Sequence, residues 1–366
     1  MSRNTIARID VPALARNLER VREWADGSRV MAVVKADAYG HGLKRCLPAL
    51  RGVDMLAVAT LDEARAVRAL DEHVPVLLLE GIMARSELEA VASLRLEMVV
   101  HHPTQLQWIE QAGRVASPRA WLKIDSGMHR LGFPPQGAAE AAERLSAVPG
   151  VEELVWMTHL ACADEPGHAA NAEQLARFDA AVGDRPGQHC IANSAALVRM
   201  PEARRDWVRA GLVLYGVSPL SDRTGPELGL EPVMTLSTRL IATNAVAAGE
   251  HVGYGARYRA DRDLHIGVAA IGYGDGYPRS MPDGAPVLVN GRRRGIAGRV
   301  SMDMTTIALE GTDDAMVGDA VVLWGRDLPV EEVAEAAGTI PYELVCRVTR
   351  RVRYQAIPYL RSMPRS

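Results

Sequence analysis

Val30-Met31-Ala32-Val33-Val34-Lys35-Ala36-Asp37-Ala38-Tyr39-Gly40-His41-Gly42 is a continuous apolar run that ends in a lysine and a glycine-punctuated turn. The five apolar residues before Lys35 predict a strand that is buried on both faces, and Gly40 and Gly42 indicate where it stops. Lys35 is therefore expected at the C-terminal end of a buried strand, where α/β folds carry their chemistry. A partly desolvated amine there can act as a Schiff-base nucleophile, although a lone lysine at a strand end more often reaches solvent.

The same strand-like pattern recurs along the first two-thirds of the chain, and helical patterns such as 61–67 and 170–182 lie between the strands. This alternation predicts an α/β fold with a parallel (β/α)8 barrel of the TIM type. A doubly wound sheet has the same periodicity and stays open as an alternative. The expected strands are 30–34, 55–58, 76–79, 97–100, 120–124, 154–157, 189–192 and 207–212.

Beyond about Pro226 the pattern changes to strand-like runs without convincing helices between them. We therefore expect an N-terminal barrel over residues 1–229 and a C-terminal β-rich domain over residues 230–366. Inside the second domain, Asn290-Gly291 predicts a hairpin with a type I′ turn. The expected strands of this domain are 235–247, 265–271, 286–289, 305–308 and 320–323.

The composition indicates a protein with small ligands. The chain has 366 residues, of which 48% are hydrophobic, which is ample for a barrel and an added domain. A formal net charge of −3 with both signs scattered argues against a nucleic-acid or membrane-surface partner. The four cysteines form no CxxC pair, so neither a metal site nor a disulfide framework is expected. The sequence has no signal core and no apolar run that would span a bilayer, which predicts a cytoplasmic location.

Two expected loops suit an anion, because phosphate sites in TIM barrels often follow strands seven and eight. The seventh strand runs into Asn193-Ser194, a polar cap that opens a helix whose backbone N–H groups can hold phosphate. The eighth runs into Arg209-Ala210-Gly211, whose glycine lets backbone approach a ligand closely. With a strand-end lysine nearby, these loops predict a phosphorylated cofactor.

Residues 34–42 resemble the cofactor-lysine motif of the alanine racemases, pyridoxal-phosphate enzymes of fold type III. Matching segments make the resemblance extend over nearly the whole chain. It implies the cofactor pyridoxal 5′-phosphate, held as a Schiff base by Lys35. It further implies contacts to the phosphate from Tyr39, Asn193, Ser194 and the backbone of Gly211 and Leu212, to the ring from His159, and to the pyridine nitrogen from Arg209.

Arg209 bears on the type of reaction. A guanidinium does not give up its proton at physiological pH, so the pyridine nitrogen stays largely unprotonated and the ring is a weaker electron sink. Decarboxylation and transamination are then disfavoured relative to local reprotonation at Cα.

Racemisation needs two bases on opposite sides of a flat intermediate. Lys35 is one of them once the substrate amine displaces it. The segment 252–258 resembles the family's tyrosine-base segment, which makes Tyr254 the second base and implies that it reaches the cofactor of the other subunit of a homodimer.

Lys123 is expected to point into the barrel near Arg130, and two cations in a low dielectric repel each other. The family often carbamylates this lysine, which turns it into an anion that orients the arginine. A plain ion pair of Lys123 with Asp125 is the alternative.

The resemblance also implies a substrate pocket. Arg130 and the backbone N–H of Met302 would bind the substrate carboxylate. Arg350 stands where some members have a phosphate-binding tyrosine, which puts that contact in doubt. The pocket walls would include Tyr273 and Asp303, and the substrate channel Asp164, Arg279 and Arg299.

The sequence thus predicts a homodimeric alanine racemase that interconverts L- and D-alanine, for peptidoglycan synthesis or for alanine catabolism. Alternatives are a related barrel decarboxylase or lyase, against which Arg209 argues, and a non-catalytic cofactor carrier, against which the β domain argues. Strictness for alanine over serine or other amino acids stays open.

Overall fold

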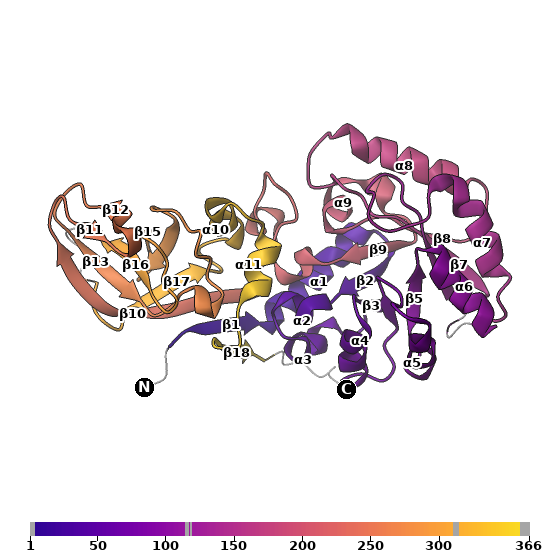
Figure 1. Ribbon diagram of the computed structural model, residues 1–366, viewed down its shortest axis with the longest axis horizontal. Helices are drawn as coiled ribbons and strands as arrows, with labels where there is room; N and C mark the ends of the chain where they lie inside the picture. The colour runs from indigo at the N-terminus through magenta and orange to yellow at the C-terminus, as the bar shows by residue number, and fades with distance from the viewer. Residues whose placement is uncertain (1–3, 114–116, 118, 310–314, 359–366) are drawn as a thin grey trace, which may run out of the picture.

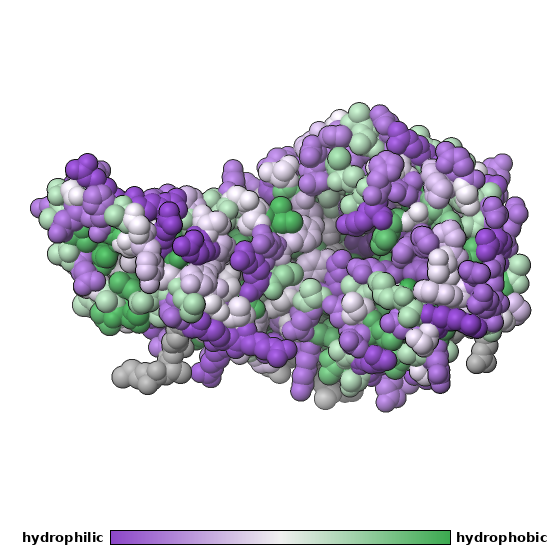
Figure 2. Space-filling view, viewed as in Figure 1, coloured by the Kyte–Doolittle hydropathy of each residue, from purple (hydrophilic) through white to green (hydrophobic). Residues whose placement is uncertain are grey.

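The computed structural model describes residues 4–113, 117, 119–309 and 315–358. A helix-covered barrel and a β-sheet domain lie side by side, and the long strand β10 (Met234–Val246) belongs to the sheet domain (Figure 1). On the face in Figure 2, hydrophilic side chains predominate over the outer helices of the barrel.

Eight parallel strands close into a barrel, because β9 pairs with β2 as well as with β8. Closure confirms the predicted (β/α)8 architecture and excludes the doubly wound sheet, whose edges stay open. Each strand overlaps a predicted run. The strands are β2 (Arg29–Val33), β3 (Met55–Val58), β4 (Val76–Leu78), β5 (Glu97–Val100), β6 (Arg119–Lys123), β7 (Glu153–Met157), β8 (Gln188–Cys190) and β9 (Trp207–Ala210).

Helices connect successive strands and cover the barrel. Several of them start at a capping side chain: α4, for example, opens with a capping box of Thr60 and Glu63. The helices of this part are α1 (Val11–Ala25), α2 (Lys35–Tyr39), α3 (Leu43–Cys46), α4 (Leu61–Arg68), α5 (Leu88–Ser93), α6 (Pro103–Ala112), α7 (Ala138–Ser146), α8 (Ala169–Val182) and α9 (Ser194–Arg199).

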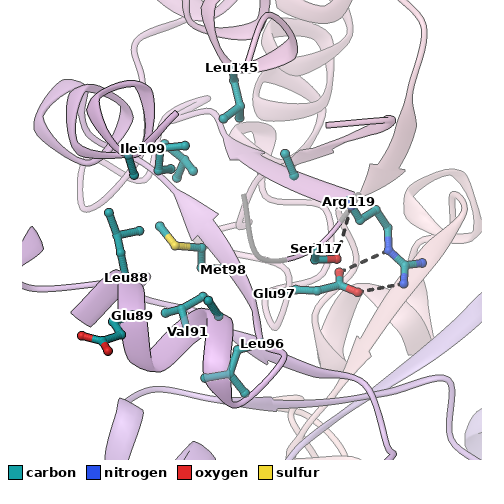
Figure 3. Close-up of a pocket in the computed structure, with 14 residues that line it drawn as sticks. Leu88, Glu89, Val91, Leu96, Glu97, Met98, Ile109, Ser117, Arg119 and Leu145 are labelled. Atoms are coloured by element: carbon teal, nitrogen blue, oxygen red, sulfur yellow. Dashed lines mark hydrogen bonds and ion pairs between the residues drawn. The ribbon is translucent and has the colours of Figure 1, made fainter. Parts of the chain in front are cut away.

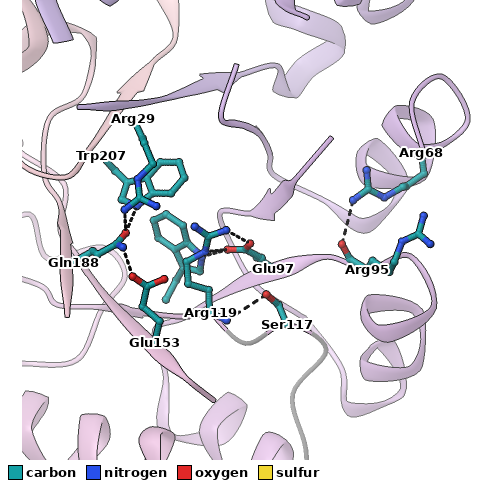
Figure 4. Close-up of polar contacts among 10 residues, drawn as sticks. Arg29, Arg68, Arg95, Glu97, Ser117, Arg119, Glu153, Gln188 and Trp207 are labelled. Carbon is teal, nitrogen blue, oxygen red and sulfur yellow. Dashed lines mark hydrogen bonds and ion pairs between the residues drawn. The ribbon is translucent and has the colours of Figure 1, made fainter. Parts of the chain in front are cut away.

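A polar and aromatic network fills the amino end of the barrel (Figure 4). The Cζ atoms of Arg29 and Arg119 lie 4.3 and 5.2 Å, respectively, from the centroid of the Trp207 ring. Glu97 accepts hydrogen bonds from Arg119 at 2.8 Å and from Trp121 Nε1 at 2.5 Å. This end of the barrel is packed, whereas TIM barrels carry their active sites at the carboxyl ends of the strands.

An apolar cavity of about 280 Å³ lies between the barrel wall and helices α5 and α6 (Figure 3). Leu88, Val91 and Ile109 line it, and the Glu97–Arg119 ion pair borders it. Residues of β5, β6 and the helices outside them line this cavity. Lys35 and the loops that were predicted to bind phosphate are not part of its lining.

The second domain is an eight-stranded sheet in the order β13-β16-β15-β14-β17-β10-β1-β18. Its neighbours pair antiparallel except for β1 and β18, which are parallel. Besides β10, its strands are β1 (Ile6–Asp10), β13 (Leu264–Ala269), β14 (Pro286–Val289), β15 (Arg292–Ile296), β16 (Thr305–Leu309), β17 (Ala320–Trp324) and β18 (Arg353–Ile357), and β11 (His251–Val252) pairs separately with β12 (Tyr258–Arg259).

The hairpin prediction is confirmed: Asn290 and Gly291 have φ of 48° and 76°, as a type I′ turn requires, and β14 pairs with β15. As expected, the described residues contain no α-helix between the predicted strands from β10 to β17. Two helices that were not predicted, α10 (Val330–Ala337) and α11 (Pro341–Arg347), follow β17. Val330, Val333 and Ala334 bury one face of α10 at helical spacing.

Strand β1 was not predicted. It lies between β10 and β18, so the first strand of the chain is part of the C-terminal sheet. Among the described residues, no helix has the length and apolarity needed to cross a membrane.

Candidate functional site

A cavity of about 640 Å³ opens at the carboxyl ends of the barrel strands. It brings together nine of the residues predicted from the sequence, although they come from loops far apart in the chain. These are Lys35, Tyr39, Lys123, Arg130, His159, Asn193, Ser194, Arg209 and Gly211.

Lys35 is the first residue of α2, directly after the buried strand β2. The next four residues, 36–39, have φ between 52° and 56°, so the lysine is followed by a left-handed helical turn built without glycine. Such a conformation costs an L-residue roughly 1–2 kcal/mol, so other contacts must hold it.

Carboxylates and a histidine hold this left-handed turn. Glu63 Oε1 accepts a hydrogen bond from the backbone N–H of Ala36 at 2.7 Å, and Asp37 Oδ1 accepts one from that of Leu43 at 2.7 Å. His41 Nδ1 lies 2.8 Å from the carbonyl oxygen of Tyr39. The turn directs both Lys35 and Tyr39 to the wall of one cavity.

Tyr39, Ser194 and Gly211 converge on one spot. The backbone N–H of Gly211 donates to Ser194 Oγ at 2.8 Å, and a Cβ added to Gly211 would lie 2.8 Å from the Tyr39 hydroxyl oxygen. Burial raises the pKa of Tyr39 well above its ordinary value, so its hydroxyl keeps its proton. These donors border a space that only glycine leaves open, which fits a phosphate group.

Asn193 and Leu212 flank this spot. Asn193 caps α9, since its Oδ1 accepts a hydrogen bond from the backbone N–H of Ala196 at 3.0 Å. Leu212 is fully buried and begins the 3₁₀ turn η5 (Leu212–Tyr215).

Arg209 is held at the floor of the cavity. Its guanidinium donates to the carbonyl oxygens of Cys190 at 2.9 Å, Thr158 at 2.9 Å and Ile191 at 3.0 Å. It also lies 3.1 Å from His159 Nδ1. Burial and then Arg209 lower the pKa of His159, so its ring is neutral and Nδ1 accepts from the arginine.

Lys123 is buried among cations. Burial, followed by Arg209, Arg130 and Lys35, lowers its pKa to about 8. Asp125 Oδ1 instead accepts from the backbone N–H groups of residues 127 and 129, at 3.0 and 2.9 Å. Within the described chain no carboxylate forms an ion pair with Lys123, so the alternative of a plain Lys123–Asp125 pair was wrong.

The remaining predicted residues do not line this cavity. Tyr254 begins the 3₁₀ turn η7 (Tyr254–Ala256) and is 69% exposed. Tyr273 and Met302 are exposed on neighbouring segments, since the backbone N–H of Gly274 donates to the Met302 carbonyl at 2.9 Å. Asp303 accepts a hydrogen bond from Arg351. The side chains of Arg279 and Arg299 are exposed. Asp164 lines an adjoining cavity of about 840 Å³, which shares His159, Asn193 and Tyr342 with the first cavity.

Tyr342 and Cys346 of α11 line the cavity and were missed from the sequence. The Tyr342 ring lies 6.0 Å from that of Tyr39, which also stacks on Tyr215 at 5.0 Å. Arg350 is exposed and does not line the cavity. Pro341, in the first turn of α11, is the sequence feature that could have indicated this helix. The position of α11 over the barrel follows from the tertiary structure alone.

The comparisons with known proteins agree over nearly the whole chain. Residues 9–219 match the family model "Alanine racemase, N-terminal domain", and residues 233–356 match "Alanine racemase, C-terminal domain". The alanine racemase of Nitrosococcus oceani is 51% identical over 347 residues, which cover 94% of this chain and 97% of that protein. That of Aliivibrio salmonicida is 47% identical over 353 residues, with 96% and 99% covered.

Solved structures give the same result. The biosynthetic alanine racemase of Pseudomonas aeruginosa superposes with a TM-score of 0.94 at 45% identity and covers 97% of this chain and 99% of its own. An alanine racemase of Bartonella henselae with covalently bound pyridoxal phosphate superposes with a TM-score of 0.87 at 28% identity, with 97% and 99% covered. This chain therefore belongs to the alanine racemases, pyridoxal-phosphate-dependent isomerases that interconvert L-alanine and D-alanine.

Proposed function

We propose that Lys35 and Tyr254 are the two bases of this racemase, and that they meet at one substrate only when two copies of the chain form a homodimer. The observation that carries the proposal is the contrast in their positions. Lys35 lines the barrel cavity, whereas Tyr254 is exposed on the other domain and does not line it.

The barrel residues suit the cofactor. Pyridoxal phosphate, when bound, supplies an electron-withdrawing ring that makes the Cα proton of the amino acid removable. Tyr39, Ser194 and the backbone of Gly211 and Leu212 bind its phosphate, while Asn193 holds the loop in place. His159 packs against the ring.

Arg209 hydrogen-bonds to the pyridine nitrogen without giving it a proton, because a guanidinium stays charged near neutral pH. Its carbonyl partners on two strand ends keep the side chain in this place. Arg209 therefore favours proton return at Cα over decarboxylation, and the homologues likewise favour the racemase over the decarboxylase alternative.

Lys35 removes the Cα proton on one face of the substrate as the neutral amine and returns it as the ammonium. Tyr254 does the same on the other face, as the phenolate and the hydroxyl. In a twofold dimer each C-terminal domain can reach the barrel of its partner. In this arrangement the barrel within residues 1–229 holds the cofactor, with Tyr342 and Cys346 of α11 beside it. Residues 230–366 also supply the second base and part of the substrate channel.

Arg130 and the backbone N–H of Met302 bind the substrate carboxylate, with Tyr273 and Asp303 as pocket walls. Asp164, Arg279 and Arg299 border the substrate channel. Lys123, as a carbamate, orients Arg130. We further propose a cytoplasmic enzyme that supplies D-alanine for peptidoglycan, which the biosynthetic character of the similar Pseudomonas aeruginosa enzyme supports over catabolism.

Subunit mixing tests this proposal. Lys35→Ala and Tyr254→Phe homodimers should each be inactive, but in a mixed dimer one site collects both lesions and the other receives both intact residues. With random reassortment about half of the dimers are mixed, so about a quarter of wild-type activity should return. Racemisation is followed by chiral chromatography, with each variant refolded alone as the control.

If activity stays absent after subunit exchange has been verified, Tyr254 acts in its own subunit's site or outside the catalytic pair. The same samples, dissolved in deuterated water, show whether Cα–H exchange requires Lys35 alone or both residues. Exchange that survives in Lys35→Ala would overturn the role of Lys35.

A further inference from the structure

Four buried side-chain polar atoms in the described part of the chain have no hydrogen-bond partner: His41 Nε2, Asn171 Oδ1, Tyr277 Oη and Trp324 Nε1. Two of these residues, His41 and Trp324, line the same small cavity of about 10 Å³. They are 0% and 1% exposed, and they come from the barrel and from β17 of the sheet domain, respectively. Because buried polar groups are nearly always hydrogen-bonded, a pair of them at one cavity indicates a ligand.

The two atoms are complementary. His41 Nδ1 lies 2.8 and 3.1 Å from the carbonyl oxygens of Tyr39 and Ala38, and a carbonyl can only accept, so Nδ1 carries the proton. Burial lowers the pKa of His41 to about 4, so the ring is neutral and Nε2 is an acceptor. The indole Nε1–H of Trp324 is a donor only.

We propose that this cavity binds one ordered water molecule, which donates to His41 Nε2 and accepts from Trp324 Nε1–H. The cavity has about the volume that a single water needs. Glu331 lines it too, and its Oε1 accepts from the backbone N–H groups of Ser218 at 2.7 Å and Gly225 at 2.8 Å. The Glu331 carboxylate can accept the second proton of the water, which completes the three hydrogen bonds typical of buried water.

The site connects the sheet domain to the left-handed turn. His41 holds the carbonyls of that turn, and Tyr215 stacks on both His41 at 4.6 Å and Tyr39 at 5.0 Å. A water bonded to His41 and to Trp324 fixes the orientation of the imidazole and thereby supports the turn that carries Lys35. The inference depends on the packing of this chain and not on the assignment of its catalytic bases.

A crystal structure of the holoenzyme, at a resolution that reveals ordered solvent, tests the site directly. We expect a solvent peak within about 2.7–3.2 Å of both His41 Nε2 and Trp324 Nε1. Well-defined density without a peak in the cavity, or a peak that contacts neither nitrogen, overturns the proposal.

A double-mutant cycle gives an independent measurement. His41→Asn keeps a donor near Nδ1 and removes the Nε2 acceptor, and Trp324→Phe removes the donor. If both residues share a water, the fall in the denaturation midpoint of the double variant should be clearly smaller than the sum of the single falls. Additive falls overturn the proposal.

Trp156→Phe is the matched control, because Trp156 Nε1 donates directly to the Pro186 carbonyl at 3.1 Å. Its effect should add to that of His41→Asn. Should either single variant fail to fold, the solvent peak in the wild-type crystal decides.

Discussion

Gly211 illustrates how one absent methyl group shapes the cofactor site. Its φ of −118° lies outside the left-handed region that favours glycine, so the close approach of a neighbouring group has to be considered. The need for glycine comes from the Tyr39 hydroxyl, which lies 2.8 Å from the position of a Cβ.

We therefore expect Gly211→Ala to fold normally and to bind pyridoxal phosphate about tenfold to a hundredfold more weakly, a loss of about 1.4–2.8 kcal/mol. Absorbance titration of the apoenzyme measures the affinity. Gly137→Ala is the control, because its Cβ would meet nothing closer than 3.7 Å. Equal affinity of the Gly211 variant and the wild type would show that the phosphate does not bind at this spot.

Lys123 shows how burial prepares an amine for reaction. Its pKa is lowered to about 8, first by burial and then by Arg209 and Arg130. Because of this shift the native state loses the proton as the pH rises through about 8, whereas a lysine with the ordinary pKa of about 10.4 still keeps it there. The neutral amine is the form that reacts with carbon dioxide.

With ¹³C-bicarbonate, a carbamate signal should appear in the wild type, strengthen as the pH rises through about 8, and be absent from Lys123→Ala. The variant should also bind alanine more weakly, since Arg130 loses its acceptor. An unmodified amine at pH 8 and above in the presence of bicarbonate contradicts the proposal. NMR and a crystal structure both provide the readout.

At the scale of the element, the left-handed turn 36–39 is the unusual feature. Its strain is local, whereas the acceptor that holds the Ala36 N–H is Glu63 of α4, which lies beyond α3 and β3 in the chain. Strain of this kind is kept where the surroundings hold it in place, and here it aims Lys35 and Tyr39 at one cavity.

Ala36→Gly should raise the stability by up to about 1 kcal/mol, because glycine adopts a positive φ without the cost paid by alanine. Ala176→Gly, the same change at an exposed position inside α8, should lower it by about 1 kcal/mol. Denaturant unfolding of both variants checks the opposite signs. A destabilised Ala36 variant would mean that the turn is not strained.

At the scale of the molecule, the two domains share one framework. Strand β1 begins the chain yet lies between β10 and β18, and a single buried cluster includes Ile9, barrel residues such as Met31, and Trp324 of the sheet. When two domains of one chain share a continuous core, the unfolding of one domain removes packing contacts from the other.

We expect the holoenzyme subunit to unfold in one transition, without a state in which only the barrel or only the sheet is folded. Far-ultraviolet circular dichroism and the fluorescence of single-tryptophan variants that keep Trp207 or Trp324 should give coincident curves at fixed protein concentration. Two separate midpoints would show that the domains fold independently.

The sequence by itself determined the features that depend on neighbours in the chain. Apolar runs predicted all eight barrel strands within a few residues, since a buried parallel strand needs only a short continuous apolar segment. Asn290-Gly291 predicted its turn for the same reason, as the φ values are a property of those two residues. The motif around Lys35 likewise indicated the chemistry.

Tertiary structure alone decided what depends on contacts between distant segments. Closure of the barrel, the insertion of β1 beside β18, the hydrogen bond from Ala36 to Glu63 and the position of Tyr342 over Tyr39 each join residues far apart in the chain. No short window of sequence contains both partners of such a contact, and the left-handed turn is stable only because those partners are present.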